Sequence, residues 1–304
     1  MKKYFKYFAY ISFVFLAIAL IRADFLRMPQ VRSWGSLIIA FVLAFGGFIS
    51  QGLSWGKTLE LHGIKTSKKE YIASTGLSIF GKYIPGKIWI ILGRAGYIAA
   101  RTGASEKDLG IISLKCQFIS LWIGILAGMP ILFIYEQFQM WAWLGVLFWL
   151  GLTFVLFTDL FSNLVEEAFK RILKMNLDIP RLSVADTIKV LPWFLATWLL
   201  WGFGFYFFGS SLVGGSLGLF SAFGFILSAT LGIVAVIAPG GLGVREGVLI
   251  PFLMLTGLSK NDAGTVAMSS RLWFLIGEAL IFLTAFVINR NLKQEANADG
   301  ARVE

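Results

Sequence analysis

The sequence predicts an all-α polytopic integral membrane protein with about six spanning helices and two broken helical hairpins. Composition is the first observation behind this fold class: 57% of the 304 residues are hydrophobic and 14% are charged, whereas a soluble domain has about 25% charged residues. The second observation is that several apolar stretches reach the roughly 20 residues that a helix needs to cross a bilayer. The third is that two long apolar stretches are interrupted by Pro-Gly pairs set among cations.

Six apolar segments are long enough to span the bilayer without interruption. The first of them follows three lysines and could be mistaken for a signal peptide, but no small-x-small cleavage site follows it. We therefore interpret it as an uncleaved first transmembrane helix. The six segments cover residues 4–21, 33–56, 111–135, 140–160, 190–210 and 264–289.

The polar parts of the chain are too short to fold alone, so residues 1–292 are predicted to form a single integral membrane domain. Residues 293–304 form a polar tail that we expect to be disordered and cytoplasmic. The stretch 161–189 mixes apolar and charged side chains at helical spacing. It is either an amphipathic helix on the cytoplasmic leaflet or a solvated connector.

The two interrupted stretches cover about 71–100, which contains GKYIPGKIWIILGR, and about 217–258, which contains APGGLGVREG. A helix that breaks in hydrocarbon frees backbone N–H and C=O groups. Such a break is tolerated only where protein or a wet cavity covers those groups. Each stretch is therefore predicted to enter the bilayer, break and return as a re-entrant hairpin.

The placement of cations predicts the topology. If the amino terminus is cytoplasmic and both interrupted stretches re-enter, eighteen of the 27 lysines and arginines lie on the cytoplasmic side and four on the other. This is the asymmetry of the positive-inside rule. It predicts a multi-pass protein of the cell membrane with both termini cytoplasmic. The two hairpins would then enter from opposite sides and could meet tip to tip, as in inverted-repeat transporters.

Five cations and two acids remain at membrane depth, which leaves a surplus of three positive charges. Charge at this depth costs several kcal/mol, roughly 2.5–3.5 per residue on insertion scales, and usually marks a binding site or a pathway. A phosphate-bearing lipid headgroup would balance the surplus, because arginine offers a forked donor and lysine a point charge. The residues are Lys82, Lys87, Arg94, Arg245, Arg271, Glu246 and Glu278.

The glycine turn of the second break supports an anion site. Gly240, Gly241 and Gly243 allow positive φ and close backbone approach, and the helix that starts after them would offer free N–H groups to an anion. Three structural alternatives remain open. The glycines could serve only helix packing, the lysines could snorkel to the interface, and the arginines and glutamates could be purely structural partners.

Several chemistries find no support in the sequence. There is no nucleotide-binding phosphate loop, no zinc pattern and no Ser-His-Asp set, since His62 is the only histidine and Cys116 the only cysteine. We expect no enzyme activity, no metal or other cofactor and no nucleic-acid partner. An enzyme with Glu246 as general base is the weakest alternative.

The motifs together resemble the lysylphosphatidylglycerol synthase transmembrane, or flippase-like, family. The resemblance spans roughly residues 5–290, and the Pro-Gly-Gly-Leu-Gly-Val-Arg-Glu turn is its most specific part. It implies movement of a phosphate-bearing lipid between leaflets, with no aminoacyl transferase domain in this chain to synthesise lysyl-lipid. The residues that carry the resemblance are Tyr83, Pro85, Gly86, Lys87, Gly93, Arg94, Pro239 to Glu246, Ser270 and Arg271.

Two functions of different classes follow. The first is a translocase for a phospholipid, an aminoacyl-phospholipid or a polyprenyl-phosphate-linked glycan, whose headgroup would lie between the hairpin tips. The second is a non-transporting scaffold or regulator of a membrane glycosyltransferase or lipid synthase, with residues 161–189 as its docking surface.

Overall fold

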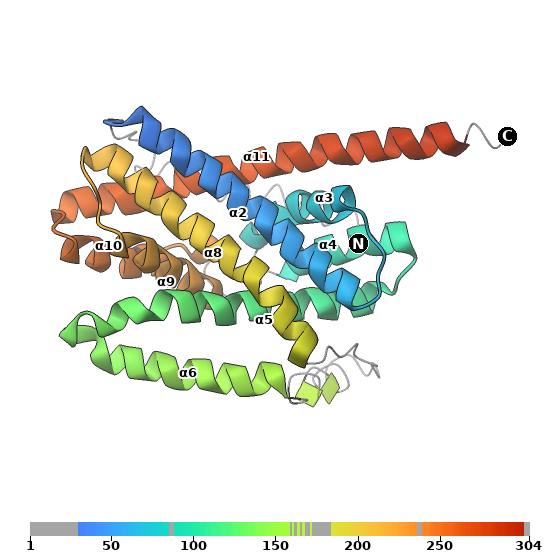
Figure 1. Cartoon of the computed structure of the whole chain (residues 1–304), viewed down its shortest axis with the longest axis horizontal. Coiled ribbons are helices and arrows are strands. Elements are labelled where there is room, and N and C mark those ends of the chain that lie inside the picture. Colours follow the sequence, from blue (N-terminus) through green and yellow to red (C-terminus); the bar gives the residue numbers. More distant parts are fainter. Residues whose placement is uncertain are drawn as a thin grey trace.

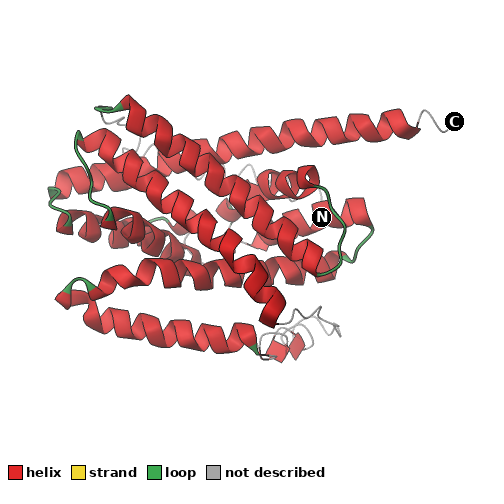
Figure 2. Cartoon of the chain, in the orientation of Figure 1, coloured by secondary structure: helices red, strands yellow, loops and turns green. Residues whose placement is uncertain are grey.

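The structure is a computed structural model that describes residues 30–84, 88–158, 184–235 and 239–300, with a few single residues between 160 and 171. The predicted helix at 4–21, the first Pro-Gly pair and most of the stretch 161–189 lie outside these residues. The described part is all α, with nine α-helices, four short 3-10 helices and no strand (Figure 2).

Five of the six predicted spans are confirmed as helices long and apolar enough to cross a membrane, judged by length and composition. Two of them include a neighbouring 3-10 turn: η2 (Met129–Phe133) extends α5, and η3 (Glu136–Phe138) precedes α6. The long helices are α2 (Trp34–Leu61), α5 (Glu106–Gly128), α6 (Gln139–Phe157), α8 (Val184–Val213) and α11 (Lys260–Gly300).

One sequence expectation needs correction at the carboxyl end. Residues 293–300, assigned to a disordered tail, continue α11 as helix to Gly300, which projects beyond the other helices in Figure 1. This segment includes good helix formers such as alanine, glutamate, lysine and glutamine. An ion pair of 2.7 Å between Lys69 and Glu295 also holds this extension against the start of α3.

The two interrupted stretches each form a pair of short helices joined by a break. The first contains α3 (Lys68–Ser78), η1 (Ile79–Tyr83) and α4 (Ile88–Thr102), and the second contains α9 (Phe220–Val234), η4 (Pro239–Gly241) and α10 (Val244–Leu255). Their helices have 11 to 15 residues, fewer than the roughly 20 that a crossing needs.

The two pairs lie at opposite ends of the molecule. In Figure 1, α3 and α4 lie toward the end where α2 finishes, whereas α9 and α10 lie toward the end where α2 begins. The breaks η1 and η4 contact each other, and α11 packs against both α3 and α10. One long helix therefore runs past both breaks at the place where they meet.

An aromatic cluster from α2, α8, α9 and α11 forms the centre of the core. The ring centroids of Phe48 and Trp201 are 5.2 Å apart, and both rings lie within 5.2 Å of Phe274. Phe225 of α9 joins the cluster at 6.1 Å from Phe274. Charged side chains of the breaks pack against this apolar cluster.

Candidate functional site

A cavity of about 460 Å³ lies beside the contact between the two breaks. All five long helices contribute to its wall, together with η1, α4, α9, η4 and α10. Most of the wall is apolar. Its charged groups are Lys82, Arg245, Arg271 and Glu278.

Glu278 fastens the first break to α11. Its side chain is fully buried, and its two carboxylate oxygens take different partners. Oε1 forms an ion pair with the Lys82 ammonium, and Oε2 accepts a hydrogen bond of 2.8 Å from the Tyr83 hydroxyl. Since both partners belong to η1, this carboxylate holds the 3-10 segment in place and neutralises its lysine.

Arg271, two turns earlier on α11, fastens the second break. Its guanidinium forms a forked pair with the Glu246 carboxylate and donates to the carbonyl oxygens of Gly240 and Gly241, each at 2.9 Å. These two carbonyls belong to η4, where the backbone leaves helical geometry. Arg271 therefore satisfies backbone acceptors that the break exposes.

Gly240 lets the two breaks touch. Its φ is 59°, in the left-handed region that side chains rarely adopt. A Cβ at this position would also lie 2.9 Å from the Tyr83 ring. A larger residue would therefore separate η4 from η1 as well as strain the turn.

The start of α10 differs in one respect from the expected anion site. The N–H of Gly243 donates to Glu246 Oε2 at 2.9 Å, so the chain's own carboxylate caps this helix. Gly241, Gly243 and Glu246 are not among the residues that line the cavity. The turn glycines thus shape the break, and the Gly243 N–H serves the cap instead of a ligand.

Arg245 is the charged group without an acidic partner. It is 8% exposed, and its guanidinium carbon lies 4.5 Å from the Phe225 ring and 5.4 Å from the Phe274 ring. Its Nε and Nη2 atoms are buried without a hydrogen-bond partner in the described part of the chain. Buried donors normally find partners, so Arg245, which also lines the cavity, is the charged side chain of this wall with unmet hydrogen-bonding capacity.

Arg94 does not join this wall. Its guanidinium stacks on the Trp55 ring at 4.7 Å and donates to the hydroxyl and the carbonyl of Ser113. It is 7% exposed and is absent from the cavity lining. Lys87, the other predicted cation of this stretch, lies outside the described residues.

The charge balance of the site is therefore simpler than the sequence implies. Lys82 is matched by Glu278 and Arg271 by Glu246. Of the cations described in this wall, Arg245 alone forms no ion pair with a described acid. The expected surplus of three charges included Lys87, which lies outside the described residues, and Arg94, which lies away from the wall. The described wall therefore has a surplus of one positive charge, at Arg245.

Two cavity residues were not predicted from the sequence. Gln51 of α2 and Gln117 of α5 line the wall, although both lie in segments predicted as ordinary spans. An uncharged amide within an apolar segment was the available signal. The search for charge and for Pro-Gly breaks did not use it.

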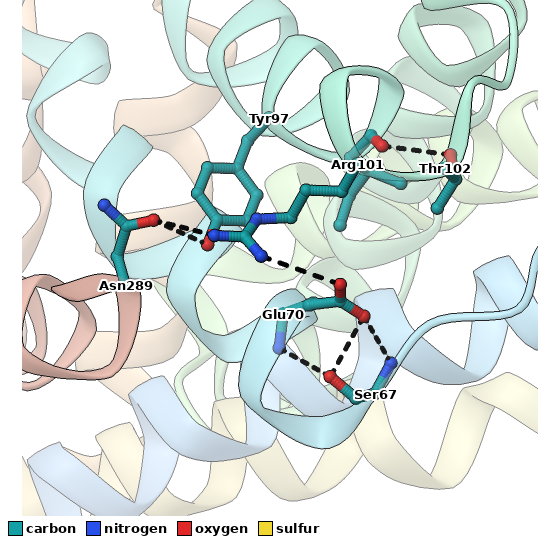
Figure 3. A network of polar contacts seen from close by, with 7 residues as sticks. Ser67, Glu70, Tyr97, Arg101, Thr102 and Asn289 are labelled. Carbon is teal, nitrogen blue, oxygen red and sulfur yellow. Dashed lines mark hydrogen bonds and ion pairs between the residues drawn. The ribbon is translucent and has the colours of Figure 1, made fainter. Parts of the chain in front are cut away.

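A second polar network lies outside the cavity and was also not predicted. Figure 3 shows Arg101 of α4 between Glu70 of α3, at 3.8 Å, and Asn289 of α11, at 3.1 Å. Tyr97 also donates to Asn289, at 3.0 Å. Glu70 in turn caps α3 by accepting from Ser67. The network ties the first pair of short helices to α11.

The described residues form an all-α fold with five helices of membrane-spanning length and a cavity, lined by three cations and one acid, beside the contact between two helix breaks. Comparison of the chain with protein-family models, curated proteins and solved structures found no match. The resemblance to the flippase-like family accordingly stays a prediction that rests on its motifs.

Proposed function

We propose that the protein is a lipid translocase that binds the phosphate of a membrane lipid at Arg245. The unpartnered, buried guanidinium of this residue carries the proposal. A phosphate oxygen would supply the missing acceptor and the missing negative charge at once, in a charge-assisted bond stronger than a neutral one. The substrate classes are a phospholipid, an aminoacyl-phospholipid or a polyprenyl-phosphate-linked glycan.

The shape of the cavity favours an amphiphile over a free anion. Its charged groups gather at the breaks, while the remaining wall is mostly apolar. Two lining residues, Phe148 of α6 and Val234 of α9, are 51% and 43% exposed. Their exposure indicates that the cavity reaches a lateral face of the helix bundle. A headgroup could then lie inside while its tails remain in the surrounding bilayer.

The two helix pairs would be re-entrant hairpins that enter from opposite leaflets. The contact between η1 and η4 and the opposite placement of the pairs support this arrangement. The protein would lie in the cell membrane. The asymmetry of its cations would place both chain termini on the cytoplasmic side. Glu246 and Glu278 would hold Arg271 and Lys82 in place while Arg245 receives the phosphate.

Membership of the flippase-like family is part of the same proposal. The motif residues that the structure describes have roles consistent with it: Tyr83 and Arg271 hold the breaks, and Gly240 permits their contact. The scaffold alternative depends on residues 161–189, most of which lie outside the described residues. Translocation is therefore the function with support from observed contacts.

Leaflet-specific labelling of lipids in proteoliposomes tests the proposal. The full chain should move a phosphate-bearing lipid, and Arg245→Met should slow that movement by about tenfold to a hundredfold, the loss expected for a hydrogen bond to a charged group. Arg290→Met removes an exposed cation of α11 and should leave the rate unchanged. Equal rates for the wild type and Arg245→Met would refute the site. Absence of movement together with co-purification of a synthase would favour the scaffold.

A further inference from the structure

Two glutamines line the cavity, each on a mostly apolar helix. Gln51 belongs to α2 and Gln117 to α5, and both are largely buried lining residues. Neither amide makes a hydrogen bond to a described residue, and the Gln51 Oε1 atom is buried with no partner among them. An amide without a partner in an apolar environment costs about 1–3 kcal/mol. Such a residue in a membrane helix is a candidate for function.

The two glutamines lie at a similar level along the helix bundle. Trp55 of α2 and Ser113 of α5 contact the same Arg94 guanidinium, so these positions are level. Gln51 precedes Trp55 by four residues and Gln117 follows Ser113 by four, a displacement of about 6 Å in each case. In Figure 1, α2 runs obliquely from left to right and α5 runs from right to left, so both displacements lead toward the left of the view. The two residues therefore lie on the same side of Arg94, each about one helical turn away from it along its own helix.

We propose that Gln51 and Gln117 form a second subsite that binds the hydroxyl-bearing part of a lipid headgroup, such as a glycerol or a sugar. Each amide offers two donors and an acceptor, the combination that matches a hydroxyl in either role. Neither amide carries a charge, so these two side chains themselves offer no ion pair to an ammonium group. The inference rests on the proposed binding of a lipid phosphate at Arg245 in the same cavity.

The size of the cavity agrees with a headgroup larger than a phosphate. Its volume of about 460 Å³ falls within the roughly 300–1,000 Å³ of ordinary ligand pockets. A phosphate at Arg245 alone would leave both amides without partners. A phosphodiester with a polyol beyond it satisfies the arginine and the glutamines together.

Lipid-induced thermal stabilisation of the purified full chain tests the subsite. The probes are dioctanoyl phosphatidylglycerol and dioctanoyl phosphatidylmethanol, which carry the same charge but differ in the headgroup hydroxyls. The wild type should bind the glycerol lipid about tenfold more tightly, since each hydrogen bond to a glutamine contributes about threefold to tenfold. The double variant Gln51→Met/Gln117→Met should lose this preference and bind both lipids equally. Gln139→Met, at an exposed position of α6, should keep it.

The outcomes separate the subsite from the proposed function. Equal binding of the two lipids by the wild type, or a preference that survives in the double variant, overturns the subsite. If Arg245→Met lowers the affinity for both lipids in that case, the phosphate site stands without it. A preference that depends on the glutamines supports the subsite even if the same preparation moves no lipid, a result that would overturn translocation alone. The unfolding temperature of the lipid-free double variant should equal or exceed that of the wild type, because two unpartnered amides are removed.

Discussion

Replacement of Arg245 should separate stability from ligand binding. In Arg245→Met, a flexible apolar side chain of similar length replaces the buried guanidinium and keeps contact with Phe225 and Phe274. If Arg245 serves to bind a ligand, this change should lower the free energy of unfolding of the ligand-free protein only slightly. If Arg245 instead had a structural role, its replacement would leave its former partners without contacts and destabilise the protein.

The structure allows the magnitude to be worked out. Two buried donors without partners cost about 1–3 kcal/mol each, and the methionine removes this cost. The two ring contacts of the guanidinium stabilise the protein by about 0.5–2 kcal/mol each, and the methionine loses them. The central value is about 4 kcal/mol for the cost of the two unpartnered donors and about 2.5 kcal/mol for the stabilisation by the two ring contacts. The free energy of unfolding of the empty protein should therefore change little or increase slightly.

Arg271→Met is the matched contrast. Arg271 pairs with Glu246 and satisfies two carbonyl oxygens of η4. Breaking a buried pair on one side costs about 3–5 kcal/mol, which corresponds to a fall of about 5–10 °C in unfolding temperature. Thermal unfolding at one scan rate, with and without dioctanoyl phosphatidylglycerol, measures both effects. If Arg245→Met unfolds as early as Arg271→Met, or keeps the full stabilisation by lipid, the reasoning is refuted.

Two further predictions concern the contacts around the breaks. Glu278→Gln leaves the Lys82 ammonium without its carboxylate and should lower the free energy of unfolding by about 3 kcal/mol; the double variant Lys82→Met/Glu278→Gln should recover most of that loss in thermal unfolding. Gly240→Ala should cost about 1–2 kcal/mol from its backbone conformation and about 1–3 more from contact with Tyr83, whereas Gly63→Ala, at a similar φ of 74° with open space around it, should show only the first cost.

Each of these results can contradict its premise. A double variant no more stable than Glu278→Gln would mean that the lysine is not the group left uncompensated. Equal unfolding temperatures for Gly240→Ala and Gly63→Ala would mean that η1 and η4 are not in close steric contact at Gly240.

The fold class was predictable because it depends on composition and segment length. Long apolar segments such as 33–56 and 190–210 leave little choice but long helices, and the structure differs from them mainly at the ends, as in α8, which begins at Val184. The second break was also predictable, since Pro239 is followed by Gly240, Gly241 and Gly243, and this dense combination disfavours a continuous helix. The helical continuation of α11 was not, because its polarity resembles that of a tail and its contact with Lys69 is distant in sequence.

The site was predictable in residue type but not in detail. Charge at membrane depth singled out Arg245, Arg271 and Glu278, and these three residues line one cavity in the structure. The pairing of each cation depends on tertiary contacts. The sequence therefore could not show that Arg94 contacts Trp55 and Ser113. The glutamines were overlooked because an uncharged amide costs too little to stand out in a hydropathy profile.

Native mass spectrometry of lipids that remain bound to the purified chain tests the central claim most directly, namely that Arg245 holds the phosphate of a lipid in the cavity. The wild type and Arg290→Met should each retain a phosphate-bearing lipid, and Arg245→Met should retain little or none under the same conditions. Equal amounts of the same lipid on the wild type and on Arg245→Met would contradict the account.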